Sequence, residues 1–164
     1  MKSIHPIAFC FILALTGCQS AGNNASDRAA QNPLTMKPVV DAIPSSALGA
    51  QELTAGECGL FLWSKTDVSK FIFFSKALSG SALFAQGEVP VSMAQISAGG
   101  DIFGQFNTRM SYQTNDGRRL ALTIEPGEVL EGGQRLESGL ITVTDKEGWE
   151  TKLPVLGVRA CQPE

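Results

Sequence analysis

The densest group of side chains that could do chemistry is a run of glutamates late in the chain. Glu125, Glu128 and Glu131 follow one another at short spacing, and Glu137 lies close by. Such carboxylates could bind a calcium ion through oxygen ligands, or act as a carboxylate pair in acid–base catalysis. Their spacing fits no calcium-loop pattern, and the glycines among them are typical of exposed loops. We therefore expect solvated glutamates rather than a metal or catalytic site.

A second candidate combines serines with a lysine. Ser79 and Ser81 flank Gly80, with Lys76 close by in sequence, and a serine activated by a lysine can act as a nucleophile. Serine and glycine are so common in hairpin turns that a turn is the simpler interpretation. The glycine-rich stretch of residues 97–104 lacks the lysine and the following helix of a phosphate-binding loop, so we expect an ordinary loop there.

The only histidine, His5, lies at the start of the chain beside a pattern typical of a signal peptide. Lys2 precedes an apolar run at residues 7–15, which is too short to cross a bilayer as a helix. Removal of residues 1–17 would leave no histidine, and hence no Ser-His-Asp or Cys-His nucleophile and no imidazole ligand for a catalytic zinc. We predict that the protein is not an enzyme and needs no metal or cofactor, although acid–base chemistry by carboxylates alone stays open.

The apolar run ends in Leu15-Thr16-Gly17-Cys18. This sequence resembles the lipobox of bacterial lipoproteins, and the resemblance covers residues 1–18 only. It implies that Cys18 is linked to diacylglycerol, becomes the new amino terminus and is acylated with a fatty acid such as palmitate. Because Gln19 is not aspartate, the sorting rule of the family implies an outer-membrane location, facing the periplasm or the outside. An ordinary secretory signal is the alternative, and it would also export the chain.

The resemblance also bears on the other cysteines. Cys10 would leave with the signal peptide and Cys18 would carry lipid, so that Cys58 and Cys161 remain. In an oxidising periplasm, two cysteines most simply form a disulfide. It would close a loop of about 100 residues and destabilise the unfolded state by roughly 4–5 kcal/mol. Two separate thiols, or pairing with another chain, are the alternatives.

The charges are nearly balanced. The chain has 13 basic and 16 acidic residues, and no run of like charge exceeds the pair Arg118-Arg119. Nucleic-acid binding needs a clustered basic face, so it is not expected. A polybasic membrane patch is not expected either. Attachment to a membrane would therefore depend on the lipid at Cys18.

The composition divides the mature chain into a tether and one domain. Residues 18–52 are rich in small and polar side chains and cannot bury enough apolar surface to fold, so we predict a largely disordered tether. Within it, Ser45 to Leu53 could form a short helix capped by serine. Residues 53–164 are predicted to form a single β domain, closed by the Cys58–Cys161 bridge.

Alternating and apolar runs joined by short turns predict an all-β domain. Residues 106–112 and 119–124 alternate between apolar and polar side chains, as half-buried strands do. We expect Pro90 to lie at an edge or a bulge and Glu125-Pro126-Gly127 to end a strand. About eight strands result, without any sustained helical period. Sequential short connections favour an antiparallel meander that forms a small barrel or a sandwich.

The first two predicted strands are apolar on both faces. Core packing is the first interpretation of such aromatic residues. A second apolar face must nevertheless be covered by the N-terminal segment, a partner or an apolar ligand. Trp149, beside a turn, could be a partly exposed anchor or, more simply, plug the end of a barrel. The residues that could form an interaction surface are Phe61, Trp63, Phe71, Phe73, Phe74 and Trp149.

These observations predict a non-enzymatic, lipid-anchored envelope protein that binds another protein or supports an envelope assembly. A carrier of a small apolar ligand, similar to lipocalin-like lipoproteins, is an alternative. An inhibitor of lysozyme or of a protease is another, because known lipoproteins of this kind have a similar size and disulfide content, but their short motifs are not found here. The sequence predicts a location at the membrane, but it does not identify the partner or ligand.

Overall fold

The computed structural model describes residues 44–164, which form eight β-strands and no helix. The strands are β1 (Cys58–Ser64), β2 (Phe71–Lys76), β3 (Ser81–Gln86), β4 (Val89–Phe103), β5 (Phe106–Gln113), β6 (Arg119–Leu130), β7 (Gly133–Thr144) and β8 (Glu150–Cys161). The prediction of an all-β domain with about eight strands is confirmed. The short helix expected from Ser45 to Leu53 is wrong, because these residues lie in an extended segment without helical turns.

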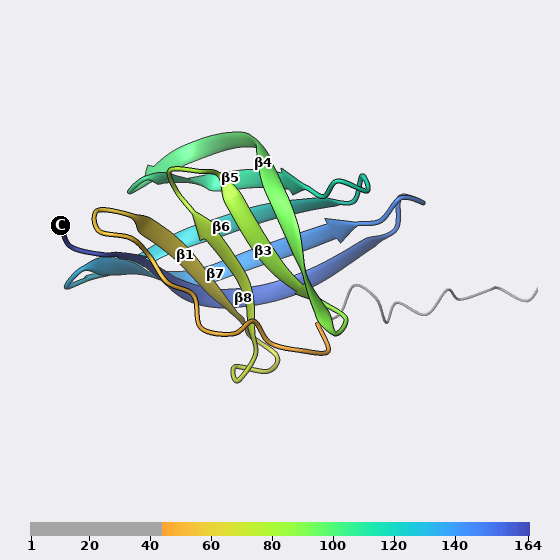
Figure 1. Cartoon of the computed structure of the whole chain (residues 1–164), viewed down its shortest axis with the longest axis horizontal. Helices are drawn as coiled ribbons and strands as arrows, with labels where there is room; N and C mark the ends of the chain where they lie inside the picture. Colours follow the sequence, from red (N-terminus) through yellow and green to blue (C-terminus); the bar gives the residue numbers. More distant parts are fainter. Residues whose placement is uncertain (1–43) are drawn as a thin grey trace, which may run out of the picture. The chain divides into compact units, whose positions relative to one another are not determined.

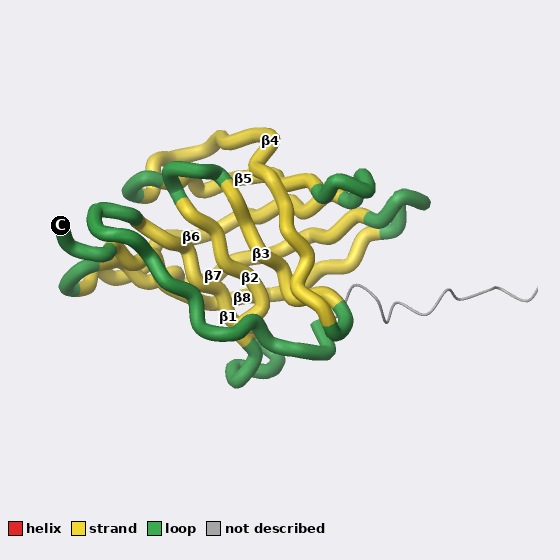
Figure 2. Tube along the Cα trace, in the orientation of Figure 1, coloured by secondary structure: helices red, strands yellow, loops and turns green. Residues whose placement is uncertain are grey.

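Each strand pairs with the next one along the chain, always antiparallel, and β8 pairs with β1 (Figures 1 and 2). The sheet is therefore a closed meander, and of the two predicted forms the structure shows the barrel. The closing pair is continuous over the whole of β1, from Cys58 opposite Cys161 to Ser64 opposite Val155. The predicted disulfide is confirmed, with the two Cα atoms 4.0 Å apart.

Because neighbouring strands are antiparallel, the connections lie alternately at two ends of the barrel. The entry end holds residues 65–70, 87–88, 114–118 and 145–149, which join β1 to β2, β3 to β4, β5 to β6 and β7 to β8. The disulfide end holds the Cys58–Cys161 bridge and the connections at residues 77–80, 104–105 and 131–132.

The interior of the barrel is filled by the side chains of its own strands. Phe73, Phe84 and Tyr112 are at most 1% exposed, and the rings of Phe73 and Tyr112 meet edge to face at 5.3 Å. The Tyr112 hydroxyl donates to Ser75 Oγ at 3.2 Å, which satisfies a polar group that would otherwise be costly to bury. Burial raises the pKa of Tyr112 to about 12, so this hydroxyl stays protonated. The inward faces predicted for residues 106–112 and 120–124 are confirmed.

Two strands continue where the sequence predicted a loop or an end. Residues 97–101 lie within β4, and the register shifts between Gly99 and Ile102. Gly100 has φ = 76° there, a conformation that glycine adopts at little cost, so a bulge replaces the expected loop. In β6 the pairing shifts on both sides of Pro126 and then continues to Leu130. Pro90 lies in a part of β4 that pairs with β3 but not with β5, which agrees with the predicted edge position.

Candidate functional site

The outer face of β1 and β2 carries a cluster of aromatic side chains, here called the aromatic face: Phe61, Trp63, Phe71 and Phe74. The ring centroids of Phe61 and Phe74 are 4.9 Å apart, and those of Phe61 and Phe71 are 5.9 Å apart. Trp63 packs on Phe71 at 5.0 Å. A register shift between Leu62 and Trp63 brings Trp63 opposite Phe71, so all four rings meet on the outside of the barrel.

Residues 44–57, here called the strap, cross the outside of the barrel from the entry end to the disulfide end (Figure 2). Near the entry end, Ser46 Oγ donates to the Gly87 carbonyl at 2.7 Å, and the Leu48 amide donates to the Phe71 carbonyl at 2.7 Å. Leu48 is only 6% exposed and belongs to the hydrophobic core. The tether predicted to extend to residue 52 therefore has to be corrected, since residues 44–52 pack against the barrel.

The far half of the strap approaches the aromatic face closely. A methyl group on Gly59 would lie 2.9 Å from Leu53 Cδ2, 2.9 Å from the Phe61 ring and 3.0 Å from the Phe74 ring. Only glycine leaves room for Leu53 at this point. The strap thus covers part of the second apolar face, which is the first of the three occupants expected from the sequence.

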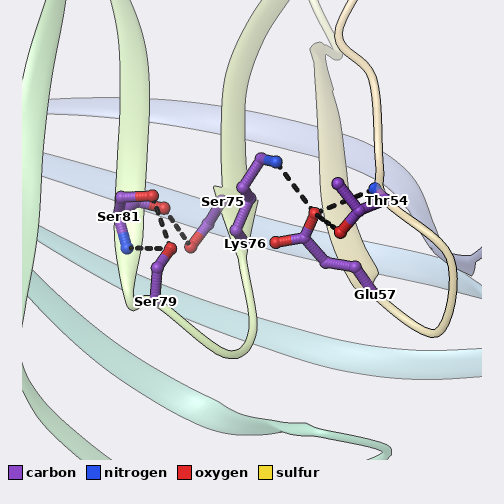
Figure 3. Close-up of polar contacts among 6 residues, drawn as sticks. All are labelled: Thr54, Glu57, Ser75, Lys76, Ser79 and Ser81. Carbon is purple, nitrogen blue, oxygen red and sulfur yellow. Dashed lines mark hydrogen bonds and ion pairs between the residues drawn. The ribbon is translucent and has the colours of Figure 1, made fainter.

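A partly buried ion pair fixes the strap where it joins β1 (Figure 3). Glu57 Oε2 accepts from Lys76 Nζ at 2.8 Å, and from the amide and the hydroxyl of Thr54 at 3.1 Å each. The ammonium group of Lys76, together with the Thr54 amide, lowers the pKa of Glu57 below its usual value. The Gln162 amide also donates to the Glu57 carbonyl at 2.9 Å. The strap and the end of the chain are therefore joined at the disulfide end.

The same contacts decide the role of the serines next to Lys76. Figure 3 shows Lys76 extending to Glu57, with Ser79 and Ser81 on the other side. The two serine hydroxyls lie 2.7 Å from each other, in the predicted turn between β2 and β3. Lys76 Nζ is directed to Glu57 Oε2 at 2.8 Å, so this nitrogen is paired with a carboxylate and not with a serine hydroxyl.

The aromatic face is only partly covered, and an apolar hollow remains beside Trp63. This hollow, here called the Trp63 groove, has a volume of about 400 Å³ and lies over β1, β7 and β8. Its lining residues are Trp63, Arg135, Leu136, Glu137, Leu156, Gly157 and Val158. A second hollow of about 460 Å³ lies between the strap and β8, and residues 51–53, Phe61 and residues 160–162 line it.

The structure brings together some of the residues predicted for an interaction surface and separates others. Phe61, Trp63 and Phe71 share the aromatic face and are partly exposed. The prediction that Phe73 belongs to an interaction surface is wrong, because Phe73 points into the barrel and has no exposed surface. The same prediction is wrong for Phe74. This side chain faces outward, but Phe61 and the strap cover it and leave it only 3% exposed.

Trp149 is not part of the aromatic face. It lies in the connection between β7 and β8 at the entry end, and 71% of its surface is exposed. The expectation that it plugs the end of the barrel is therefore wrong. Its amide donates to Asp145 Oδ1 at 2.9 Å, so the turn itself, rather than contact with the core, determines its position.

The remaining candidates have no shared geometry. Glu125, Glu128, Glu131 and Glu137 are exposed as expected, although Glu125 and Glu128 lie on β6 and Glu137 lies on β7 rather than in loops. In residues 44–164, no group of three or more histidine, cysteine, aspartate or glutamate side chains could hold a metal ion. Cys18 lies outside the described residues.

Sequence reasoning missed two charged residues with structural roles. Glu57 stands directly before the first apolar strand, and only the fold reveals its partner on β2. Arg159 lies on the inward-facing side of β8, with its guanidinium carbon 5.6 Å from the centre of the Phe103 ring. A methyl group on Gly104, which has φ = 63°, would lie 2.7 Å from Arg159 Nε. The alternation of β8 could have indicated that Arg159 faces inward, but nothing local indicated its aromatic partner.

Comparison with protein-family models, with curated proteins and with solved structures finds no match for this chain. Within residues 44–164 no helix is long and apolar enough to cross a membrane.

Proposed function

We propose that this protein is a non-enzymatic envelope lipoprotein, anchored to the outer membrane through lipid on Cys18, which binds a partner protein in the Trp63 groove. The observation that carries this proposal is the contrast between the two sides of the barrel wall. The inside is occupied by the protein's own side chains, whereas the outside retains an apolar groove beside a partly exposed tryptophan.

The filled interior gives less support to a carrier of the lipocalin type. Such a carrier holds its ligand inside the barrel, in space that the wall residues leave open. Here large side chains such as Phe73, Phe84 and Phe103 are at most 1% exposed, and the two hollows described above open on the outside. An apolar molecule would have to displace the core in order to enter.

The lining of the Trp63 groove suits a protein segment. Trp63, Leu156 and Val158 supply apolar contact area, and Arg135 and Glu137 stand at the rim with opposite charges. Buried aromatic anchors surrounded by polar groups are typical of the energetic centre of protein interfaces. A groove of this size accepts a few apolar side chains of the partner, flanked by charged or polar residues that pair with the rim.

The reactive groups support a binding role rather than catalysis. Lys76 is ion-paired with Glu57, Ser79 is bonded to Ser81, and the glutamates of β6 and β7 are exposed without a shared site. Each of these groups stabilises the fold or is solvated.

Photo-crosslinking in the native envelope tests the proposal. A photoreactive residue in place of Trp63 should give one constant protein adduct, and a second substitution in the groove, Leu156→Glu, should abolish it. The matched control is the same photoreactive residue in place of Thr123, an exposed position on β6. The same adducts from both positions, or an adduct that survives Leu156→Glu, would count against binding in the groove. Loss of fatty-acid labelling in a Cys18→Ala variant tests the anchor separately.

A further inference from the structure

Three neighbouring strands form the part of the outer surface that contains the Trp63 groove. β7 pairs with β8, and β8 pairs with β1, so their residues stand side by side in rows that cross the three strands. Successive side chains of a strand point to opposite faces of the sheet, so every second row faces outward. The row at the centre of the groove faces inward and is buried: Leu136, Gly157 and Leu62.

Two outward rows flank this buried row. The first, here called the Val158 row, consists of Arg135, Val158 and Phe61. The second, here called the Leu156 row, consists of Glu137, Leu156 and Trp63; Glu137 lies where the register of β7 shifts opposite Leu156. The charged side chains of both rows are exposed, and the apolar ones are partly exposed.

The two rows match each other position by position. Each has a charged side chain on β7, an aliphatic side chain on β8 and an aromatic ring on β1, and the two charges are opposite. A half-turn about an axis along the buried row exchanges the two rows. A second copy laid face to face by this rotation therefore places its Val158 row on the Leu156 row of the first, and its Leu156 row on the Val158 row. Arg135 then faces Glu137 of the other copy twice.

The next outward positions on β7 and β8 are complementary in size. Beyond the Val158 row, Ala160 pairs with Gly133, and the hollow of about 460 Å³ lies between this end of β8 and the strap. Beyond the Leu156 row, Pro154 pairs with Leu140, and both side chains are exposed. The same half-turn brings the larger pair of one copy over the smaller pair of the other.

We propose that the partner in the Trp63 groove is a second copy of this chain, packed face to face through β1, β7 and β8 as a two-fold dimer. This inference rests on the proposed function, because it names the occupant of the groove on which that function depends. The dimer covers apolar side chains of the groove in both copies. A partner surface with charge of one sign would repel either Arg135 or Glu137, whereas an identical face supplies both signs in the matching order.

Photo-crosslinking with two tagged chains tests the identity of the partner. One full-length chain carries a photoreactive residue in place of Trp63 and a first epitope tag, and a wild-type chain in the same envelope carries a second tag. We expect an adduct of two chains that contains both tags, with the photoreactive residue joined to β1 of the wild-type chain near Phe61.

The other outcomes of this experiment separate the dimer from the proposed function. An adduct with a different protein, and none between the two tagged chains, would overturn the dimer while leaving binding in the groove intact. No adduct of either kind would overturn both proposals. An adduct of two chains joined outside β1, β7 and β8 would overturn the face-to-face packing.

Charge reversal tests the matching of the two rows. Arg135→Glu gives a face with two carboxylates, and Glu137→Arg gives a face with two guanidinium groups. Each variant alone should lower the yield of the two-chain adduct about tenfold, because two attractions become two repulsions. The two variants produced together should restore the yield, since each copy then supplies the charges that pair with those of the other.

The matched control is Arg119→Glu, a charge reversal at an exposed position on β6 outside the dimer face. It should leave the adduct yield unchanged. Arg135 and Glu137 are exposed, so neither reversal should prevent folding, and urea unfolding of each variant checks this. An equal loss of adduct in the control, or no recovery when the two reversed chains are combined, would overturn the proposed dimer.

Discussion

At the scale of single residues, the ion pair between Glu57 and Lys76 is the contact with the clearest dependence on pH. Glu57 is 6% exposed, and its carboxylate accepts three hydrogen bonds within the strap and from β2. The lowered pKa of Glu57 means that folding favours its ionised form. The ionised Glu57 therefore contributes its full stabilisation above the ordinary carboxyl pKa of 4.5. This contribution is lost as the pH falls through the lower pKa of the folded state.

We predict that Glu57→Gln lowers the free energy of unfolding at pH 7, because Lys76 loses its partner and the ionised acceptor disappears. The difference from the wild type should shrink as the pH falls from 4.5 through the lower folded pKa, since wild-type Glu57 is protonated in both states only below that folded pKa. Urea unfolding of both proteins at pH 7 and at pH 3 measures this difference in the free energy of unfolding. Glu88→Gln, at an exposed position, controls for the lost charge. A difference that is equal at both pH values would show that ionisation of Glu57 does not matter.

The aromatic residues show how far residue-level reasoning reaches. The apolar character of β1 and β2 correctly indicated two covered faces, but it did not tell Phe73 from Phe74. In an all-apolar strand no polar residue marks the outer face, so alternation gives two equally good assignments. Packing between Phe73 and Tyr112, which are distant in sequence, decides between them.

At the scale of elements, the strap is the part of the domain that depends most on tertiary contacts. It has no strand partner along its length and is held by a few hydrogen bonds, by Leu48 and Leu53, and by the Glu57 ion pair. Its sequence is mostly small and polar, so composition alone predicted a tether. The apolar side chains at positions 48 and 53 are too few to predict packing without the aromatic face that they cover.

We predict that Leu48→Ala lowers the free energy of unfolding by about 2–3 kcal/mol, as expected for a buried leucine whose site can partly collapse. Urea unfolding measures the change, and limited proteolysis should show faster cleavage within the strap. Ala47→Ser, at the exposed neighbouring position, should change the stability by less than about 0.5 kcal/mol. Equal effects of both substitutions would mean that the strap does not pack as the structure shows.

At the scale of the whole molecule, closure of the barrel rests on the pairing of β1 with β8 and on the disulfide between them. The bridge joins residues 103 positions apart, and its main effect is to restrict the unfolded chain. The ladder between β1 and β8 continues over the whole of β1, so the fold does not depend on the covalent bond alone.

We predict that the double variant Cys58→Ala, Cys161→Ala still folds but loses about 4–5 kcal/mol of stability, the chain-entropy value for a loop of this length. Urea unfolding of the oxidised wild type and of the variant gives the difference. Reduction of the wild type should bring its stability close to that of the variant. A loss below about 1 kcal/mol would show that the unfolded state is already compact without the bridge.

The class of fold and the approximate number of strands could be predicted, because alternation in residues 106–113 and 119–124 and the turn residues between them are local signals. Barrel and sandwich could not be distinguished. That choice depends on whether the first strand meets the last one, which is decided by packing across the whole domain. Only Cys58 and Cys161, if paired, indicated that the two ends of the sheet meet.

The strap and the bridge together determine how the protein would carry a mechanical load. A pull on the N-terminal side of residue 44 acts first on the contacts of Ser46 and Leu48, which would open one after another as in peeling. Peeling would stop at Cys58, because the covalent bond to Cys161 fastens the start of β1 to the last strand. The strap would thus lengthen only by the difference between its extended length of about 45 Å and the distance that it already spans along the barrel, while the barrel itself stays closed.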